Sequence, residues 1–163
     1  MSETLIQFNF AQELANWTRR VAGMYVKDLH ALSDQAYTQC QGGTCRTMQD
    51  VTAECAGFNM MVTAMIKGDA VPEFSDEQRA SYTASLGTRE KGAKAIETTA
   101  NAMADAMASN GHRMGEMVTA PWGETMNVFN LAVLSSNHML YHDGQLNFVQ
   151  SLNGDDKMHW FDE

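Results

Sequence analysis

The sequence predicts an all-α fold, a four-helix bundle formed by a single domain that spans residues 1–163. Four long segments repeat apolar residues at the three- and four-residue spacing of one helical face. The chain has only 2 prolines, and both lie outside these segments. Hydrophobic residues make up 44% of the chain, which is enough for a core. Long amphipathic helices with modest connections favour a bundle.

The first helix is expected over residues 4–32, with an apolar stripe that runs through Phe8, Leu14 and Tyr25. A connection that ends in two glycines, residues 33–44, should follow it. The second helix is expected over residues 46–67. Gly68 then stops this helix, since glycine readily adopts the left-handed conformation that closes a helix.

Ser75 followed three residues later by Gln78 has the pattern of a capping box, which predicts the start of a short helix. The third long helix is expected over residues 88–109 and should end at an Asn-Gly pair. The segment that follows contains a Pro-Trp-Gly turn. The fourth helix is expected over residues 126–153. The acidic tail, residues 155–163, contains His159-Trp160, which we expect to dock the tail on the bundle, and a role at a site stays open.

The charge and cysteine content limit the partners and the compartment. The formal net charge is −9, without a cluster of Lys and Arg, so we expect neither nucleic acid nor an anionic membrane as a partner. No apolar run is long enough to span a membrane, and the first residues do not form a signal peptide. The 3 cysteines include no Cys-x-x-Cys pair, which argues against a disulfide framework and favours a reducing, cytoplasmic location.

The core seam of the fourth helix is polar in its middle. Steps of three and four residues along this seam give Val128, Leu131, Ser135, His138, His142, Gln145, Val149 and Leu152. Each buried polar group without a partner costs roughly 1–3 kcal/mol, so four consecutive polar positions need a common explanation. A metal ion with ordered water would supply one. The alternative is a set of core side chains that hydrogen-bond one another.

His138 and His142 are four residues apart and therefore share one helical face, from which both can bind one ion. Met139 follows the first histidine, so the glutamate of the zinc-protease motif H-E-x-x-H is missing. The chain also has no Glu-x-x-His pair, which disfavours a carboxylate-bridged di-iron site. Tyr141 and Asp143 flank the pair, and for both of them we expect a solvated face.

A third ligand should come from another helix. Glu54 falls among the apolar core positions of the second helix, and a cation would offset the cost of burying its carboxylate. Cys55 lies beside it on a neighbouring seam, and the residue pattern does not choose between the two. Gln145 and Ser135 are candidates to hydrogen-bond the ligands without binding the ion.

The C-terminal part of the chain, residues 121–160, resembles the last helix of DinB/YfiT-like proteins. The stretch YHDGQLNFVQSLNGD carries the resemblance, because these proteins share a histidine pair four residues apart followed closely by Gly-Gln-Leu. The stretch RTMQDVTAECAGFN resembles the family's second helix. Alignment on its Ala-x-x-Ala-Gly pattern places Glu54 where the family usually has its first metal-binding histidine. The resemblance therefore implies Glu54, His138 and His142 as ligands in place of three histidines.

The resemblance also implies a function. DinB-like relatives include divalent-metal-dependent transferases and isomerases that use low-molecular-weight thiols, and dimers are common among them. We therefore expect a homodimeric metalloenzyme with a small-molecule substrate. One carboxylate and two imidazoles suit Zn, Ni, Fe or Mn. The alternative function is a stress protein that binds a metal or a small ligand at the same site without turnover. The sequence does not indicate catalytic residues.

Overall fold

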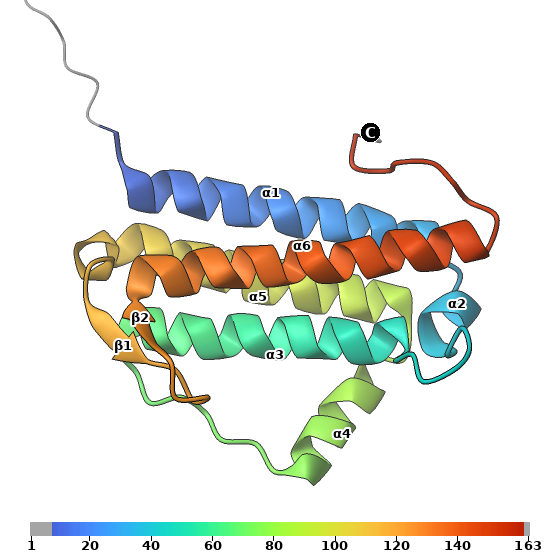
Figure 1. Cartoon of the computed structure of the whole chain (residues 1–163), viewed down its shortest axis with the longest axis horizontal. Coiled ribbons are helices and arrows are strands. Elements are labelled where there is room, and N and C mark those ends of the chain that lie inside the picture. Colours follow the sequence, from blue (N-terminus) through green and yellow to red (C-terminus); the bar gives the residue numbers. More distant parts are fainter. Residues whose placement is uncertain (1–7, 162–163) are drawn as a thin grey trace, which may run out of the picture.

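The protein, seen in a computed structural model, is described here over residues 8–161. Within this part of the chain, four long helices lie side by side and form a bundle (Figure 1): α1 (Phe10–Ala31), α3 (Met48–Lys67), α5 (Arg89–Ser109) and α6 (Val128–Leu152). Both α1 and α3 pack against α5 and against α6. The predicted helical bundle is therefore confirmed. None of the described helices combines the length and the apolarity that crossing a bilayer requires.

Capping residues decide where the long helices begin. The side chain of Asn9 accepts a hydrogen bond from the amide of Gln12, so α1 starts at Phe10. The predicted start at residue 4 lies outside the described residues. Phe8 precedes the helix and is 59% exposed, so its predicted place in the apolar stripe is wrong. Thr47 caps α3 through a capping box with Asp50, which moves the start of that helix two residues past the predicted one.

The segment before α6 departs from the all-α prediction. Strands β1 (Met117–Thr119) and β2 (Thr125–Asn127) form an antiparallel hairpin in which Val118 lies opposite Met126. The hairpin closes at Gly123, whose φ of +90° suits glycine. Because β2 takes up residues 125–127, α6 begins at Val128 with Asn127 as its cap, and not at residue 126.

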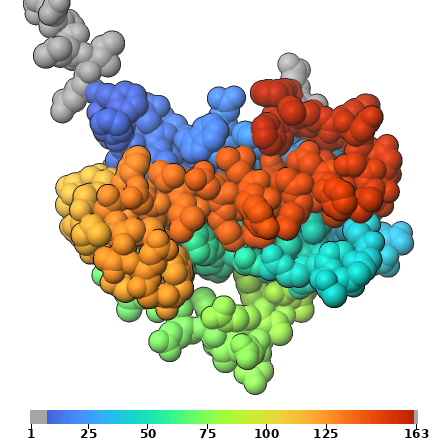
Figure 2. All heavy atoms as spheres, viewed as in Figure 1, coloured from blue at the N-terminus to red at the C-terminus, as the bar shows by residue number. Residues whose placement is uncertain are grey.

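Three shorter helical elements complete the described chain: α2 (Asp34–Thr38), α4 (Asp76–Ser85) and the 3₁₀ turn η1 (Gly111–Arg113). The capping box predicted for Ser75 and Gln78 is present at the start of α4. No residue of α4 is buried, and this helix protrudes from the bundle as Figure 2 shows. The core therefore lies among the four long helices, where its largest fully buried side chains include Tyr25, Leu29, Ile66, Ile96, Met103, Leu131, Met139 and Leu146.

Gly92 allows α5 to pack closely against the α2–α3 side of the bundle. A Cβ at this position would lie 3.0 Å from Tyr37 Cζ and 3.2 Å from Thr52 Cγ2. Both neighbours are fully buried, so neither can turn out into solvent to make room. We therefore expect Gly92→Ala to lower the free energy of unfolding by about 1–3 kcal/mol, as overpacking does.

Gly23→Ala is the matched control, because a Cβ at Gly23 would meet no atom within 4 Å. The greater helix propensity of alanine should leave this variant as stable as the native chain, or more stable by up to about 1 kcal/mol. Urea unfolding of the two variants measures the difference. Equal stability of the two variants would contradict the close packing at Gly92.

Candidate metal centre

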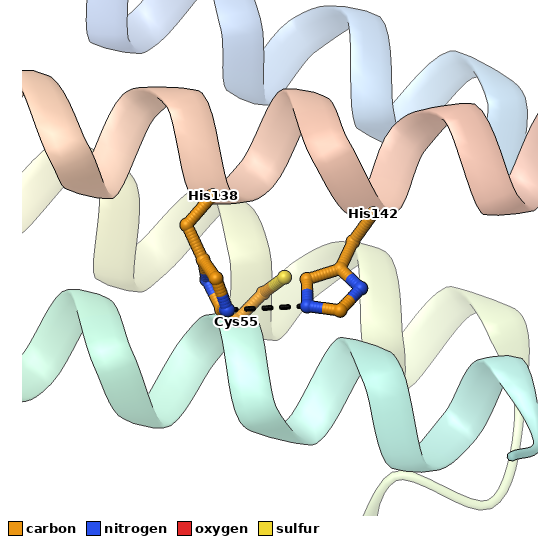
Figure 3. Close-up of side chains that lie close together, drawn as sticks. All are labelled: Cys55, His138 and His142. Carbon is orange, nitrogen blue, oxygen red and sulfur yellow. Dashed lines mark hydrogen bonds between the residues drawn. The ribbon is translucent and has the colours of Figure 1, made fainter.

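Three potential metal ligands meet between α3 and α6 (Figure 3). Cys55 comes from α3, and His138 and His142 come from successive turns of α6. The Cys55 Sγ and one ring nitrogen of each histidine all lie within 4.8 Å of one another, so the group could hold a metal ion. Cys55 and His142 are buried, whereas His138 is partly exposed. The prediction that the two histidines share a face is confirmed.

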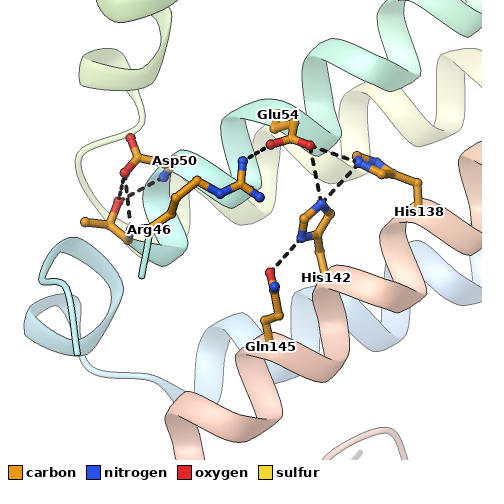
Figure 4. A network of polar contacts seen from close by, with 7 residues as sticks. Arg46, Asp50, Glu54, His138, His142 and Gln145 are labelled. Carbon is orange, nitrogen blue, oxygen red and sulfur yellow. Dashed lines mark hydrogen bonds and ion pairs between the residues drawn. The ribbon is translucent and has the colours of Figure 1, made fainter. Parts of the chain in front are cut away.

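Glu54 contacts the same two histidines from a partly exposed position on α3, whereas a buried core position was expected. Its Oε1 lies 3.1 Å from His138 Nε2 and 3.4 Å from His142 Nε2. The two Nε2 atoms are themselves 3.1 Å apart. The Glu54 side chain is 41% exposed, so its predicted place in the core is wrong. Although the side chain is this exposed, its carboxylate lies against the two histidines, as Figure 4 shows.

Arg46 binds the other oxygen of Glu54, a contact that no motif in the sequence predicts. Its guanidinium forms an ion pair with Glu54 Oε2, as Figure 4 shows. Burial raises the pKa of the Glu54 carboxyl, but the hydrogen bonds from Arg46 and His138 outweigh burial and leave this pKa below its usual value. Glu54 is therefore anionic at neutral pH. Arg46 precedes α3, so no helical spacing links it to Glu54 in the sequence.

Gln145 sets the tautomer of His142. Its Oε1 lies 2.7 Å from His142 Nδ1, and an amide oxygen can only accept, so Nδ1 carries the proton. In the neutral ring Nε2 is then the nitrogen with the free lone pair, and it faces His138 and Glu54. This is the arrangement in which a histidine binds a metal through Nε2 while its other nitrogen donates to an acceptor.

His138 is the less constrained of the two imidazoles. Its ring packs against Phe58 with centroids 4.7 Å apart, and its Nδ1 is buried without a hydrogen-bond partner in the described part of the chain. Burial, and repulsion from His142 whenever that ring is protonated, lower the pKa of His138, and Glu54 opposes them only in part. The ring is therefore neutral at neutral pH, the form that binds a metal.

Ser135 belongs to a different network. Its hydroxyl donates to Asn59 Oδ1 at 2.9 Å, and Asn59 in turn approaches Thr99 on α5. The single explanation expected for four polar seam positions therefore covers only His138, His142 and Gln145.

Asp143 is fully buried, so the predicted solvated face is wrong for this residue, although Tyr141 is exposed as expected. Trp160 Nε1 donates to Asp28 Oδ2 at 2.8 Å and to Asp143 Oδ2 at 3.0 Å. Burial and the neighbouring Asp28 raise the pKa of Asp143 to about 8. The predicted docking of the tail through Trp160 is confirmed by these bonds. Asp28 falls on the buried stripe of α1, which is the signal that could have revealed this network.

A cavity of about 310 Å³ lies between the start of α3, the loop before it and the C-terminal half of α6. Two of its lining residues, Arg46 and Gln145, are each one contact away from a candidate ligand. The others are loop residues and apolar side chains of α3 and α6: Gln41, Thr44, Cys45, Met48, Val51, Phe148 and Val149. A small molecule in this cavity would therefore lie next to the Glu54–histidine cluster.

No model of a known protein family matches the chain, and no curated protein sequence matches it. The resemblance to DinB/YfiT-like proteins therefore remains a prediction. The structure itself establishes a helical bundle with a buried cluster of one cysteine and two histidines that could bind a metal ion.

Proposed function

We propose that the protein is a divalent-metal-dependent enzyme in which His138, His142 and Glu54 bind the ion. The separations of their ligand atoms support this set, since Oε1 and the two Nε2 atoms form a triangle with sides of 3.1, 3.1 and 3.4 Å. Ligand atoms around a tetrahedral zinc ion, at bonds of about 2.0–2.1 Å, are about 3.3 Å apart. Little rearrangement is therefore needed for one ion to contact all three.

The protonation states support the same set. In the neutral ring, Nε2 of His142 is a hydrogen-bond acceptor, and so is Oε1 of Glu54. These two acceptors lie close to each other without a donor between them. A shared proton on His138 can satisfy one of these acceptors at a time. A divalent cation would satisfy both, and Arg46 keeps the far oxygen of Glu54 neutralised.

Exposure is the observation that carries the enzymatic part of the proposal. The side chains of Glu54 and His138 are 41% and 20% exposed, so an ion between them would face water on one side. Structural zinc sites are closed by four protein ligands, whereas catalytic sites keep a position open. When bound there, the ion would polarise a carbonyl group or lower the pKa of a coordinated water or thiol.

The adjacent cavity supports a small-molecule substrate. Arg46 and Gln145 line it on the side of the cluster, and Met48, Val51 and Phe148 make much of the remainder apolar. In this setting Arg46 orients Glu54, and Gln145 orients the ring of His142. Together with the DinB/YfiT-like resemblance, the cavity supports a transferase or isomerase that uses a low-molecular-weight thiol. The resemblance alone supports a homodimer, and the cysteine content alone supports a cytoplasmic location.

The test is turnover by the metal-loaded protein. The full chain is loaded in turn with Zn²⁺, Mn²⁺, Ni²⁺ or Fe²⁺ and incubated with glutathione or cysteine and an electrophile such as an epoxide or an alkyl halide. We expect thiol conjugates, detected by mass spectrometry, that form faster than in protein-free controls and are abolished by a chelator. If the chain binds a metal but accelerates none of these reactions, the proposed enzymatic function is wrong and the protein is a non-catalytic metal-binding protein.

A further inference from the structure

Two cysteines outside the candidate metal centre face each other in the loop between α2 and α3. Cys40 and Cys45 are both exposed and free, and their Sγ atoms are 3.2 Å apart. The loop lies at the end of the bundle where α2 packs against α3 (Figure 1). The two thiols are therefore in contact with each other and accessible to small molecules in solution.

The backbone of the loop brings the thiols together. Gly42 and Gly43 have φ values of +131° and +59°, which reverse the chain between the two cysteines. The amide of Gly42 lies 3.4 Å from Cys40 Sγ, and the thiol of Cys45 donates to the carbonyl oxygen of Gly42 at 2.7 Å. The amide of Cys45 donates to the same carbonyl oxygen at 3.3 Å. The thiol contact is thus part of a folded turn.

We propose that Cys40 and Cys45 form a redox-active dithiol that reacts with low-molecular-weight disulfides and closes into an intramolecular disulfide. Closure has to bring the sulfur atoms from contact to a bond of about 2.05 Å, which is a movement of about 1 Å. The two glycines between the cysteines give the loop the freedom to make this movement. This proposal does not depend on the proposed metal-dependent function.

Cys45 is the attacking residue. The hydrogen bond from Cys40 lowers the pKa of the Cys45 thiol, and backbone amides of Gln41 and Gly42 that donate to the sulfur lower it further, against the opposing effect of desolvation. The thiolate of Cys45 attacks one sulfur of the small disulfide, whose S–S bond breaks. The leaving thiolate takes up the proton that Cys45 has released, and a mixed disulfide remains on Cys45.

Cys40 resolves this mixed disulfide. Its sulfur, after loss of the thiol proton, attacks Cys45 Sγ, and the second small thiolate leaves and takes up that proton. Two protein thiols and one small disulfide thus give one protein disulfide and two small thiols. The protein is oxidised by two electrons, and the small disulfide is reduced by the same two.

Cys55 provides an internal control. It is fully buried, and burial is the main cause that raises the pKa of its thiol far above the usual value. The small disulfide should therefore leave Cys55 reduced. Cys45 also lines the same cavity as Arg46, which directly follows it in the chain. The Cys40–Cys45 disulfide would therefore form close to the residue that binds Glu54 of the proposed metal site.

The experiment exposes the reduced full-length protein to oxidised glutathione, quenches it with acid, and alkylates all remaining thiols after unfolding. Mass spectrometry with peptide mapping should find a Cys40–Cys45 disulfide and alkylation of Cys55 alone. The Cys40→Ser variant should instead retain glutathione on Cys45, and the Cys45→Ser variant should form no intramolecular disulfide. Three alkylated cysteines in the native chain, a glutathione adduct that does not resolve, or a disulfide that includes Cys55 would each overturn the proposal.

Discussion

His142→Ala is expected to abolish tight binding of zinc and to leave the helical bundle folded. His142 is 2% exposed, and its Nε2 is one corner of the triangle of proposed ligand atoms. Loss of a residue that merely supports a ligand costs about 10–100-fold in metal affinity, so loss of a ligand should exceed about 100-fold. Competition with a chromophoric chelator measures the affinity, and circular dichroism reports the fold.

His112→Ala is the matched control for this substitution. His112 is exposed on η1, at a distance in the sequence from both helices of the cluster, so its removal should leave zinc affinity unchanged. Equal zinc affinity of His142→Ala and the native chain would contradict the site. If circular dichroism shows that His142→Ala does not fold, the same measurement is made on His138→Ala. The ring of His138 is partly exposed, so its removal should disturb the packing less.

Glu54→Gln is expected to weaken metal binding by about 100-fold or more, because it removes the charge of a proposed ligand, whereas Cys55→Ser should weaken it much less. The two residues are adjacent on α3, yet they relate differently to the histidines. Glu54 Oε1 lies 3.1 and 3.4 Å from the two Nε2 atoms. The Cys55 thiol, whose pKa burial raises, would have to release a proton inside the core before it could bind an ion.

The chelator competition, carried out on these two variants, decides whether Glu54 or Cys55 is the third ligand beside the two histidines. Glutamine preserves the shape of Glu54 and removes its charge, and serine preserves the size of Cys55 and removes its sulfur. If Cys55→Ser loses the metal and Glu54→Gln retains it, the third ligand is Cys55 and the carboxylate is not needed. The metal preference should follow the ligand, because a thiolate favours zinc and a carboxylate admits Mn²⁺ and Fe²⁺.

The four long helices could be predicted because their apolar positions recur over twenty or more residues. Their exact starts could not, since a single side chain such as that of Asn9 decides where the first helical hydrogen bond forms. The β1–β2 hairpin could not be predicted for a different reason. Its strands are 3 residues each, and so short a segment shows no alternation between apolar and polar side chains.

The two histidines of the site could be predicted because residues four apart on a helix always share a face. The place of Glu54 could not, because a flexible side chain brings its carboxylate back to the bundle from an exposed position. The buried Asp143 accepts a hydrogen bond from Trp160, which reaches it from the tail beyond the end of α6. Contacts of this kind are formed by tertiary packing, and the only periodic signal for this one is the place of Asp28 on the buried stripe of α1.

The most direct test of the metal centre is elemental mass spectrometry of the native chain, purified without an affinity tag or added metal, beside the His138→Ala/His142→Ala double variant. The proposed site predicts about one equivalent of a divalent metal in the native chain and its loss from the double variant. Absence of metal from both proteins, before and after incubation with Zn²⁺, Mn²⁺, Ni²⁺ and Fe²⁺, would contradict it and leave the histidine cluster as a purely structural hydrogen-bond network.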